Sequence, residues 1–190
     1  MKKFILMLAM CFGLAFNTQA QEYRNELGVS YGYYTIPQFA YIFGGVLGAA
    51  FTLGHFTFDN TIMTGSFGME YTRNECTWFG WGFSSFAEIM TADAYNVDKD
   101  GNKTPSGKFD MYAVSTMVTA KFKWFDRMHF GMYSKFGFGP GIFISDEAQI
   151  MPVIQVSPIC MEFGGRSLRG IAEIGVGTQG VAVIGVKKSF

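Results

Sequence analysis

The stretch at residues 27–33 reads LGVSYGY, and it alternates bulky apolar side chains with glycine and serine. The bulky residues occupy the odd-numbered positions, Leu27, Val29, Tyr31 and Tyr33, and the small residues occupy the even-numbered positions between them. We call this odd or even position of a residue its parity. A period of two is the period of a β-strand, whose successive side chains point to opposite faces. The stretch therefore predicts a strand with one apolar face and one small or polar face.

The same alternation recurs seven more times along the chain. It predicts further strands over Thr61–Thr72, Thr77–Ile89, Phe109–Trp124, His129–Gly139, Gln149–Phe163, Leu168–Val176 and Val181–Phe190. Short connections are expected at 73–75, 125–128, 164–167 and 177–180, and longer loops at 35–60, 90–108 and 140–148. An even number of strands with alternating short turns and longer loops is typical of bacterial outer-membrane barrels. The sequence thus predicts an all-β, eight-stranded antiparallel transmembrane up-and-down β-barrel.

The alternation changes phase once, near Pro158. Ile154 and Val156 share one parity, whereas Ile159 and Met161 share the other. Proline lacks the N–H that a sheet interior needs, so within sheets it is confined to edges and bulges. We therefore expect a β-bulge near Pro158 that keeps one apolar face throughout the strand.

Composition supports a lipid-facing exterior. The chain has 24 Gly and 21 Phe, with 17% aromatic and only 16% charged residues, which is little charge for a soluble surface. Aromatic side chains fall near predicted strand ends, as in the interfacial girdles of membrane barrels: Tyr31, Tyr33, Tyr112, Trp124 and Phe190. An apolar chain without serial spanning helices indicates a barrel.

Residues 1–20 have the order of parts of a secretory signal peptide. Lys2 and Lys3 precede an uncharged apolar run, and Ala20 supplies a small residue at the expected cleavage point. A lipoprotein signal ending at Cys11 is the alternative, but Met10 stands where a small residue is expected. The prediction is a signal peptide at 1–20, a single domain at 21–190, and export to the cell outer membrane.

The mature chain offers little sign of other function classes. Without Lys2 and Lys3, 13 Lys and Arg stand against 15 Asp and Glu, a net charge of −2, so no basic patch suggests nucleic acid. Cys76 and Cys160 fall on strands three apart and are expected to be separate thiols. Cys and His show no metal-binding spacing, and no cofactor is expected.

The inward faces of the predicted strands carry charges of both signs. These residues are Glu70, Glu88, Lys121, Lys135, Glu162, Glu173 and Lys187. An ion path or a catalytic carboxylate pair is one interpretation. The favoured one is a structural polar network, because side chains fill an eight-stranded interior and buried charges must be paired.

The two histidines do not indicate catalysis. His129 falls beside a short turn and His55 in the first long loop, and no local spacing presents a Ser-His-acid triad. Both are expected to be surface or interface residues.

The stretch 36–58 carries no charged residue and is unusually apolar. We expect a loop with a short helix near 37–50 that caps the barrel mouth or lies on the membrane rim. Its candidate contact residues for lipid or a partner protein are Phe39, Tyr41, Phe43, Leu47 and Phe51. A plug, or a part of the first hairpin, is the structural alternative.

The C-terminal part, about residues 150–190, contains a distinctive set of residues: 155–159, Glu162, 164–165, 169–170, Glu173, Gly175, Gly177, Gly180 and the terminal Phe190. In this pattern it resembles a family of small outer-membrane β-barrel proteins of Gram-negative bacteria, porin-like or OmpX-like. The resemblance implies that Phe190 is an assembly signal for the barrel-insertion machinery, with Lys188 departing from the usual apolar residue. It transfers no catalytic residue.

These observations predict a non-enzymatic outer-membrane protein with a structural or cell-surface interaction role. Its working surface would be the outer loops 35–60 and 90–108, and its partners outer-membrane lipid and an extracellular partner that the sequence does not identify. The alternatives are a narrow channel for ions or small solutes, an outer-membrane lipid-modifying enzyme, and a soluble lipocalin-like carrier.

Overall fold

The structure is a computed structural model that describes residues 25–40, 42–43, 56–97, 102–145 and 147–190. Residues 1–20, predicted to be a signal peptide, lie outside the described residues, as does His55. Eight strands make up the chain: β1 (Asn25–Tyr33), β2 (Phe56–Asn74), β3 (Phe79–Val97), β4 (Lys103–Asp126), β5 (Phe130–Ile144), β6 (Ala148–Gly164), β7 (Leu168–Gly177) and β8 (Ala182–Ser189).

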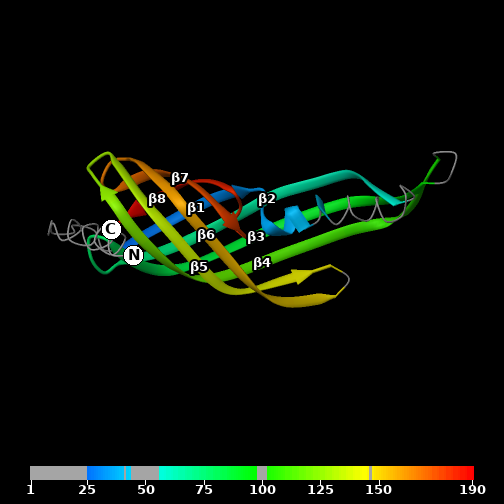
Figure 1. Cartoon of the computed structure of the whole chain (residues 1–190), viewed down its shortest axis with the longest axis horizontal. Coiled ribbons are helices and arrows are strands. Elements are labelled where there is room, and N and C mark those ends of the chain that lie inside the picture. The colour runs from blue at the N-terminus through cyan, green and yellow to red at the C-terminus, as the bar shows by residue number, and fades with distance from the viewer. Residues whose placement is uncertain (1–24, 41, 44–55, 98–101, 146) are drawn as a thin grey trace, which may run out of the picture.

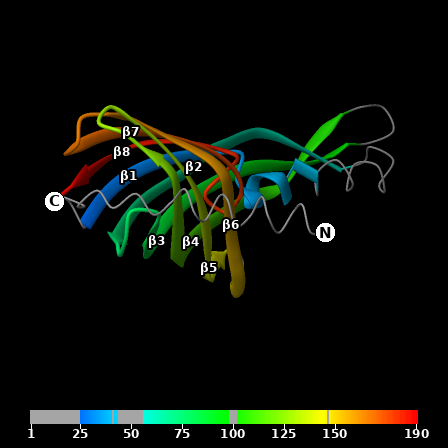
Figure 2. The same cartoon turned by 60° about the vertical axis from the view of Figure 1, so that its left-hand side comes forward.

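Each strand pairs antiparallel with the next, and β8 pairs with β1, so the sheet closes into a ring (Figures 1 and 2). This order follows from the short connections, because antiparallel neighbours can be joined by tight turns. The predicted all-β, eight-stranded antiparallel up-and-down fold is confirmed. We call the end with the turns at 75–78, 127–129 and 165–167 the turn end, and the opposite end the mouth.

The strands at the mouth are longer than the sequence predicted. Most of the predicted loop 90–108 is strand, because β3 and β4 stay paired from Thr91↔Asp110 out to Val97↔Lys103. The predicted loop 140–148 is largely strand as well, and β2 begins at Phe56 rather than Thr61. These segments were misassigned because their polar residues hide the apolar alternation, although cross-strand pairs still hold them in the sheet.

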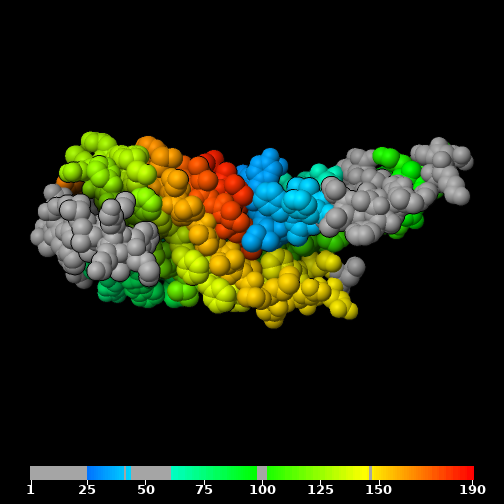
Figure 3. All heavy atoms as spheres, in the orientation of Figure 1, coloured from blue at the N-terminus to red at the C-terminus, as the bar shows by residue number. Residues whose placement is uncertain are grey.

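The wall of the ring is uneven in height. β7, β8 and β1 are short, whereas β2, β3 and β4 run well beyond them at the mouth and form a projecting sheet, seen at the right of Figure 1. The β5–β6 hairpin ends separately, and the space-filling view shows it apart from that projection (Figure 3).

The predicted bulge at Pro158 is confirmed. The register of β6 against β7 shifts between Val156 and Ile159, and Pro158 and Ile159 are both exposed. Glu162 is buried on the opposite face from Ile159. The Pro158 carbonyl accepts a hydrogen bond of 2.7 Å from the Ser134 hydroxyl across a matching irregularity in β5. The bulge thus keeps a single apolar outward face on both sides of the proline.

The two faces of the ring differ in chemistry throughout. Outward side chains are large, apolar and exposed, among them Val29, Phe67, Phe83, Val118, Phe138, Ile154, Val176 and Ile184. Inward side chains are buried and mostly polar, among them Ser84, Thr119, Lys121, Lys135, Gln155, Ser157, Glu173 and Lys187. The distribution is the reverse of that in a soluble protein, in which apolar residues fill the interior.

Inside the ring, an apolar cluster lies toward the mouth. Phe86, Met117 and Val153 form it, and Phe143 packs against it. The β7–β8 turn folds inward beside them: the backbone of Gln179 approaches Gly32 so closely that a Cβ there would lie 1.7 Å from the Gln179 carbonyl oxygen. Only glycine permits that approach, so Gly32 sets how deeply the turn enters the ring. Among the described residues, no helix is both long and apolar enough to cross a membrane.

Candidate functional site

The turn end of the interior holds a cluster of buried ion pairs. The Lys121 ammonium donates to Oε2 of Glu26 at 2.9 Å and to Oε1 of Glu162 at 2.7 Å. The Lys187 ammonium donates to the same two oxygens. The four residues come from β4, β1, β6 and β8, and the side chain of each points into the ring. Two carboxylates and two ammonium groups thus tie distant parts of the ring together.

Arg169 on β7 closes this cluster toward the turns. Its Nη1 donates to Glu162 Oε2 at 3.0 Å and to Asp126 Oδ1 at 2.7 Å, and its Nη2 donates to the Arg127 carbonyl at 2.8 Å. Arginine carries five donors in a planar fork, so one side chain can serve several acceptors at once. It therefore fastens the β4–β5 turn to the interior.

A second cluster lies next to the first, deeper in the ring. The Lys135 ammonium donates to Glu70 Oε2 at 2.8 Å and lies 2.7 Å from Glu173 Oε2. Tyr133 links the two clusters, because its hydroxyl donates to Glu173 while Lys121 Nζ lies 4.1 Å from its ring centroid. A cation over an aromatic face is attracted by the ring.

The charges of the joined clusters balance. The acids are Glu26, Glu70, Asp126, Glu162 and Glu173, and the bases are Lys121, Lys123, Lys135, Arg169 and Lys187. Each acid of this set has a basic partner within 4 Å, as buried charges require. The charged groups of this set are therefore bonded to one another, as the predicted structural network requires. The described residues contain no group of three or more His, Cys, Asp or Glu able to hold a metal.

The structure brings six of the seven predicted interior residues into this set and separates the seventh. Glu88 is buried on the inward face of β3 but lies toward the mouth. Both its carboxylate oxygens accept from the Thr35 hydroxyl, at 2.9 and 2.8 Å. Among the described residues, no Lys or Arg forms an ion pair with it.

Thr35 caps a short helical segment over residues 36–40 and 42–43. Its hydroxyl oxygen accepts a hydrogen bond from the backbone N–H of Gln38 at 3.3 Å. In return, the Gln38 side-chain oxygen accepts hydrogen bonds from the backbone N–H groups of Thr35 and Tyr34. This reciprocal arrangement is a capping box. Because Thr35 and Gln38 are fully buried, the segment is held over the mouth with its first turn facing inward.

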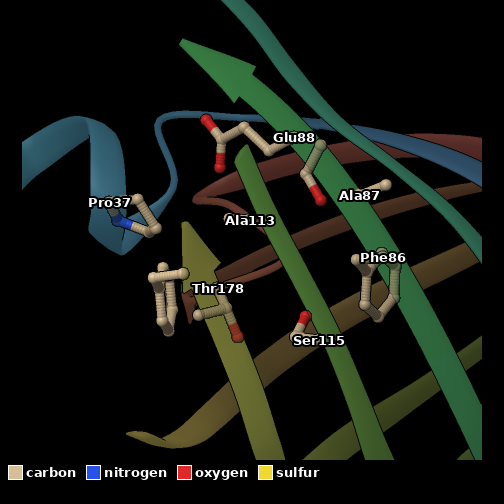
Figure 4. Close-up of a pocket in the computed structure, with 9 residues that line it drawn as sticks. Pro37, Phe86, Ala87, Glu88, Ala113, Ser115 and Thr178 are labelled. Carbon is tan, nitrogen blue, oxygen red and sulfur yellow. The ribbon is translucent and has the colours of Figure 1, made fainter. Parts of the chain in front are cut away.

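A small cavity lies beneath this segment, with room for about one water molecule. Figure 4 shows Pro37 on one side and Phe86, Ala87, Glu88, Ala113, Ser115 and Thr178 around it. Its size suits a solvent molecule rather than a substrate.

The opposite side of the helical segment is apolar and exposed. Of the predicted contact residues, Phe39 and Phe43 are exposed, the latter by 61%, while Tyr41, Leu47 and Phe51 lie outside the described residues. Ile36 and Ile42 are exposed beside them. The described part of the predicted contact surface therefore both caps the mouth and presents an apolar face.

Other predicted residues occupy separate places. Phe190 is exposed, and its backbone forms hydrogen bonds with Asn25 that join the C-terminus to the start of β1. His129 is exposed at the turn between β4 and β5. Cys76, between β2 and β3, and Cys160, buried on β6, are free thiols.

Sequence reasoning missed Glu26, Asp126 and Arg169 of the ion-paired set, and it also missed the capping pair at the mouth, Thr35 and Gln38. Glu26 shares the parity of Gly28 and Gly32, and Arg169 that of Glu173, so extending the alternation by a residue or two would have found both. The Thr-x-x-Gln spacing at 35–38 is itself a signature of a helix start.

Comparison with known protein families, with curated proteins and with solved structures gave no match. The family resemblance of the C-terminal part stays a prediction.

Proposed function

We propose that this chain is an integral outer-membrane β-barrel that acts without catalysis, as a structural or cell-surface interaction protein. One observation carries the proposal: the closed sheet exposes large apolar side chains outward and buries paired charges inward. Such an exterior costs free energy in water but not in hydrocarbon. Export with removal of residues 1–20, and insertion through recognition of Phe190, belong to the same proposal.

The height of the apolar face supports a membrane location. On the outward face of β3, apolar residues extend from Phe79 to Ile89, and Thr91 and Asp93 follow. At about 3.3 Å per residue this stretch is about 33 Å long, and a strand tilt of about 40° reduces it to a height of about 25 Å. That matches the apolar band of about 25 Å in outer-membrane barrels.

One pair of polar side chains within this band forms its own hydrogen bond. The hydroxyls of Ser85 and Thr116 lie outward on β3 and β4, 3.2 Å apart. A hydroxyl that faces hydrocarbon needs a partner, since lipid tails offer none. The pairing is therefore compatible with lipid contact.

The filled interior of the ring argues against a channel function. Charged residues fill the turn end, the cluster of Phe86, Met117 and Val153 follows, and the helical segment with Thr35 closes the mouth. An eight-stranded ring leaves only enough room for such side chains. Function would then reside on surfaces outside the ring, above all on the projecting sheet of β2, β3 and β4.

Selective amine labelling on intact cells tests this arrangement. Lys108 is exposed at the mouth and Lys188 is exposed at the turn end. A membrane-impermeant amine reagent, followed by mass spectrometry, should modify Lys108 on intact cells and Lys188 only after the outer membrane is permeabilised. Modification of Lys188 but not Lys108 on intact cells would overturn the proposed orientation, and no association with the membrane fraction would overturn the proposal.

A further inference from the structure

We propose that the exposed face of the helical segment 36–43 lies in the lipid interface of the membrane leaflet at the mouth, and so anchors the capped end of the ring in lipid. The inference rests on the proposed membrane location and names the contact that this surface makes. Its residues are Tyr34, Ile36, Phe39, Ile42 and Phe43, all exposed.

The segment has a fixed orientation, so its two faces are distinct. Thr35 and Gln38 are buried through the capping box, and Thr35 also donates to Glu88 on β3. Pro37 is buried against the small cavity at the mouth (Figure 4). Because the inward face is held by these contacts, the apolar face must remain on the outside of the assembly.

Aromatic rings connect this face to the outward face of the ring. Tyr33 ends β1 on its outward side, and its ring meets that of Tyr34 with centroids 4.7 Å apart. The rings of Tyr34 and Phe39 follow at 6.1 Å, and those of Phe39 and Phe43 at 6.4 Å. The exposed face of the segment thus continues the apolar exterior of β1 without a break.

In the register of the sheet, the continuation occurs at the row where the apolar exterior of β3 and β4 ends. One row of paired residues across β1 to β4 contains Tyr31, Phe67, Ala87 and Val114. The next outward residues toward the mouth include Tyr33 on β1 and the pair Ile89 and Tyr112. Beyond that pair the outward residues become polar, with Asp110 opposite Thr91 and Lys108 opposite Asp93. Tyrosine and phenylalanine at such a boundary are typical of interfacial girdles.

The chemistry of the face favours lipid over protein. Residues 36–43 read IPQFAYIF and contain no charge. Protein interfaces have polar rims, whereas interfacial helices bury Phe, Trp and Leu at the boundary of headgroups and acyl chains. Without Lys or Arg the segment would bind through apolar area, with no requirement for anionic lipid.

Spin-label accessibility in phosphatidylcholine vesicles tests the inference. In a background with Cys76→Ser and Cys160→Ser, single cysteines at Phe39, Phe43, Phe67 and Lys108 would carry a nitroxide. Phe67 reports the outward face of the ring, and Lys108 is the exposed polar control. We expect the ratio of oxygen to nickel-chelate accessibility to be several-fold higher at 39, 43 and 67 than at 108.

The outcomes separate the two claims. A lipid-like ratio at 67 with water-like ratios at 39 and 43 would overturn the anchoring inference and leave the membrane barrel standing. Labels at 39 and 43 that are immobilised and shielded from both reagents would show that protein covers the face, which also overturns it. A water-like ratio at 67 would overturn the barrel proposal itself. Two independent positions, both on the exposed face, guard against a local effect of either substitution.

Discussion

The ammonium of Lys187 on β8 lies 2.8 Å from Oε2 of Glu26 on β1, so a buried ion pair joins the last strand of the ring to the first. These strands are also joined by their backbone pairing, in which Lys187 stands opposite Gly28. The next residue, Lys188, points outward and is exposed. Two adjacent lysines of the same strand therefore have opposite environments.

This contrast gives a matched pair of variants. Lys187→Met leaves Glu26 and Glu162 with one fewer cation in a buried site, and we expect it to lower the free energy of unfolding by about 3–5 kcal/mol. Lys188→Met should change it by less than about 0.5 kcal/mol. Urea unfolding of the purified protein in phosphatidylcholine vesicles measures both. Equal, small effects would contradict a structural role for the interior ion pairs.

The proposed lipid-facing exterior predicts that the cost of a charged substitution depends on its depth in the membrane. Val118 lies outward on β4, midway between Tyr112 and Trp124, and is 55% exposed. In lipid, Val118→Arg should cost about 2–4 kcal/mol of unfolding free energy, whereas Asp110→Arg, beyond the apolar band, should cost about 0–1 kcal/mol. The same vesicle assay distinguishes them. A soluble protein would tolerate an exposed arginine at both positions alike.

A tight approach of two strands predicts a glycine requirement. Gly65 in β2 has φ +73°, and a Cβ there would lie 2.7 Å from the Gly32 carbonyl oxygen. Gly65→Ala should destabilise the protein by about 1–3 kcal/mol, since it combines backbone strain with a clash against backbone. Gly165→Ala, whose Cβ would meet nothing nearer than 4.0 Å, is the control and should be nearly neutral. If both variants unfold at the same urea concentration, the close approach of Gly65 to the backbone of β1 is wrong.

The capping contacts predict local order at the mouth. Thr35→Val removes the donor to Glu88 and the acceptor for the Gln38 amide. Loss of an N-cap costs about 0.5–2 kcal/mol, so amide hydrogen exchange at Gln38 and Phe39 should accelerate by roughly twofold to thirtyfold. Thr91→Val, on the outward face of β3, is the control and should leave these amides unchanged. Unaltered exchange in Thr35→Val would mean that other contacts hold the segment.

The filled interior predicts an electrically silent protein. The ion-pair clusters, the apolar cluster and the capped mouth follow one another along the ring axis. Planar-bilayer recordings of the purified protein should therefore show no reproducible conductance steps. Steps that Lys135→Ala enlarges would contradict this and support the narrow-channel alternative.

Much of the fold could be predicted because each strand of the ring has two chemically different faces. Leu27 to Tyr33 shows this most clearly, and the phase change at Pro158 predicted the bulge correctly. The extension of β3 and β4 toward Val97 and Lys103 could not be seen in this way. The outward face of these extensions includes polar residues such as Thr91, Asp93 and Lys108, so the contrast that marks a strand weakens beyond the apolar band.

The membership of the interior set was predictable in part, but its geometry was not. Inward parity identified Lys121, Glu162 and Lys187, because between bulges the alternation decides which face a residue occupies. It could not separate Glu88 from them, since position along the ring axis depends on strand register and bulges. Its bond to Thr35 depends on where the chain after β1 turns back over the mouth.

Heat-dependent electrophoretic mobility is the most direct test of the central claim, that the closed sheet is a membrane barrel. We predict that the native protein stays with the membrane fraction after carbonate extraction and migrates differently in unheated and boiled detergent samples. Its folded, ion-paired ring would resist detergent until heated. Recovery in the soluble periplasmic fraction, with identical mobility before and after boiling, would contradict the account and favour a soluble carrier.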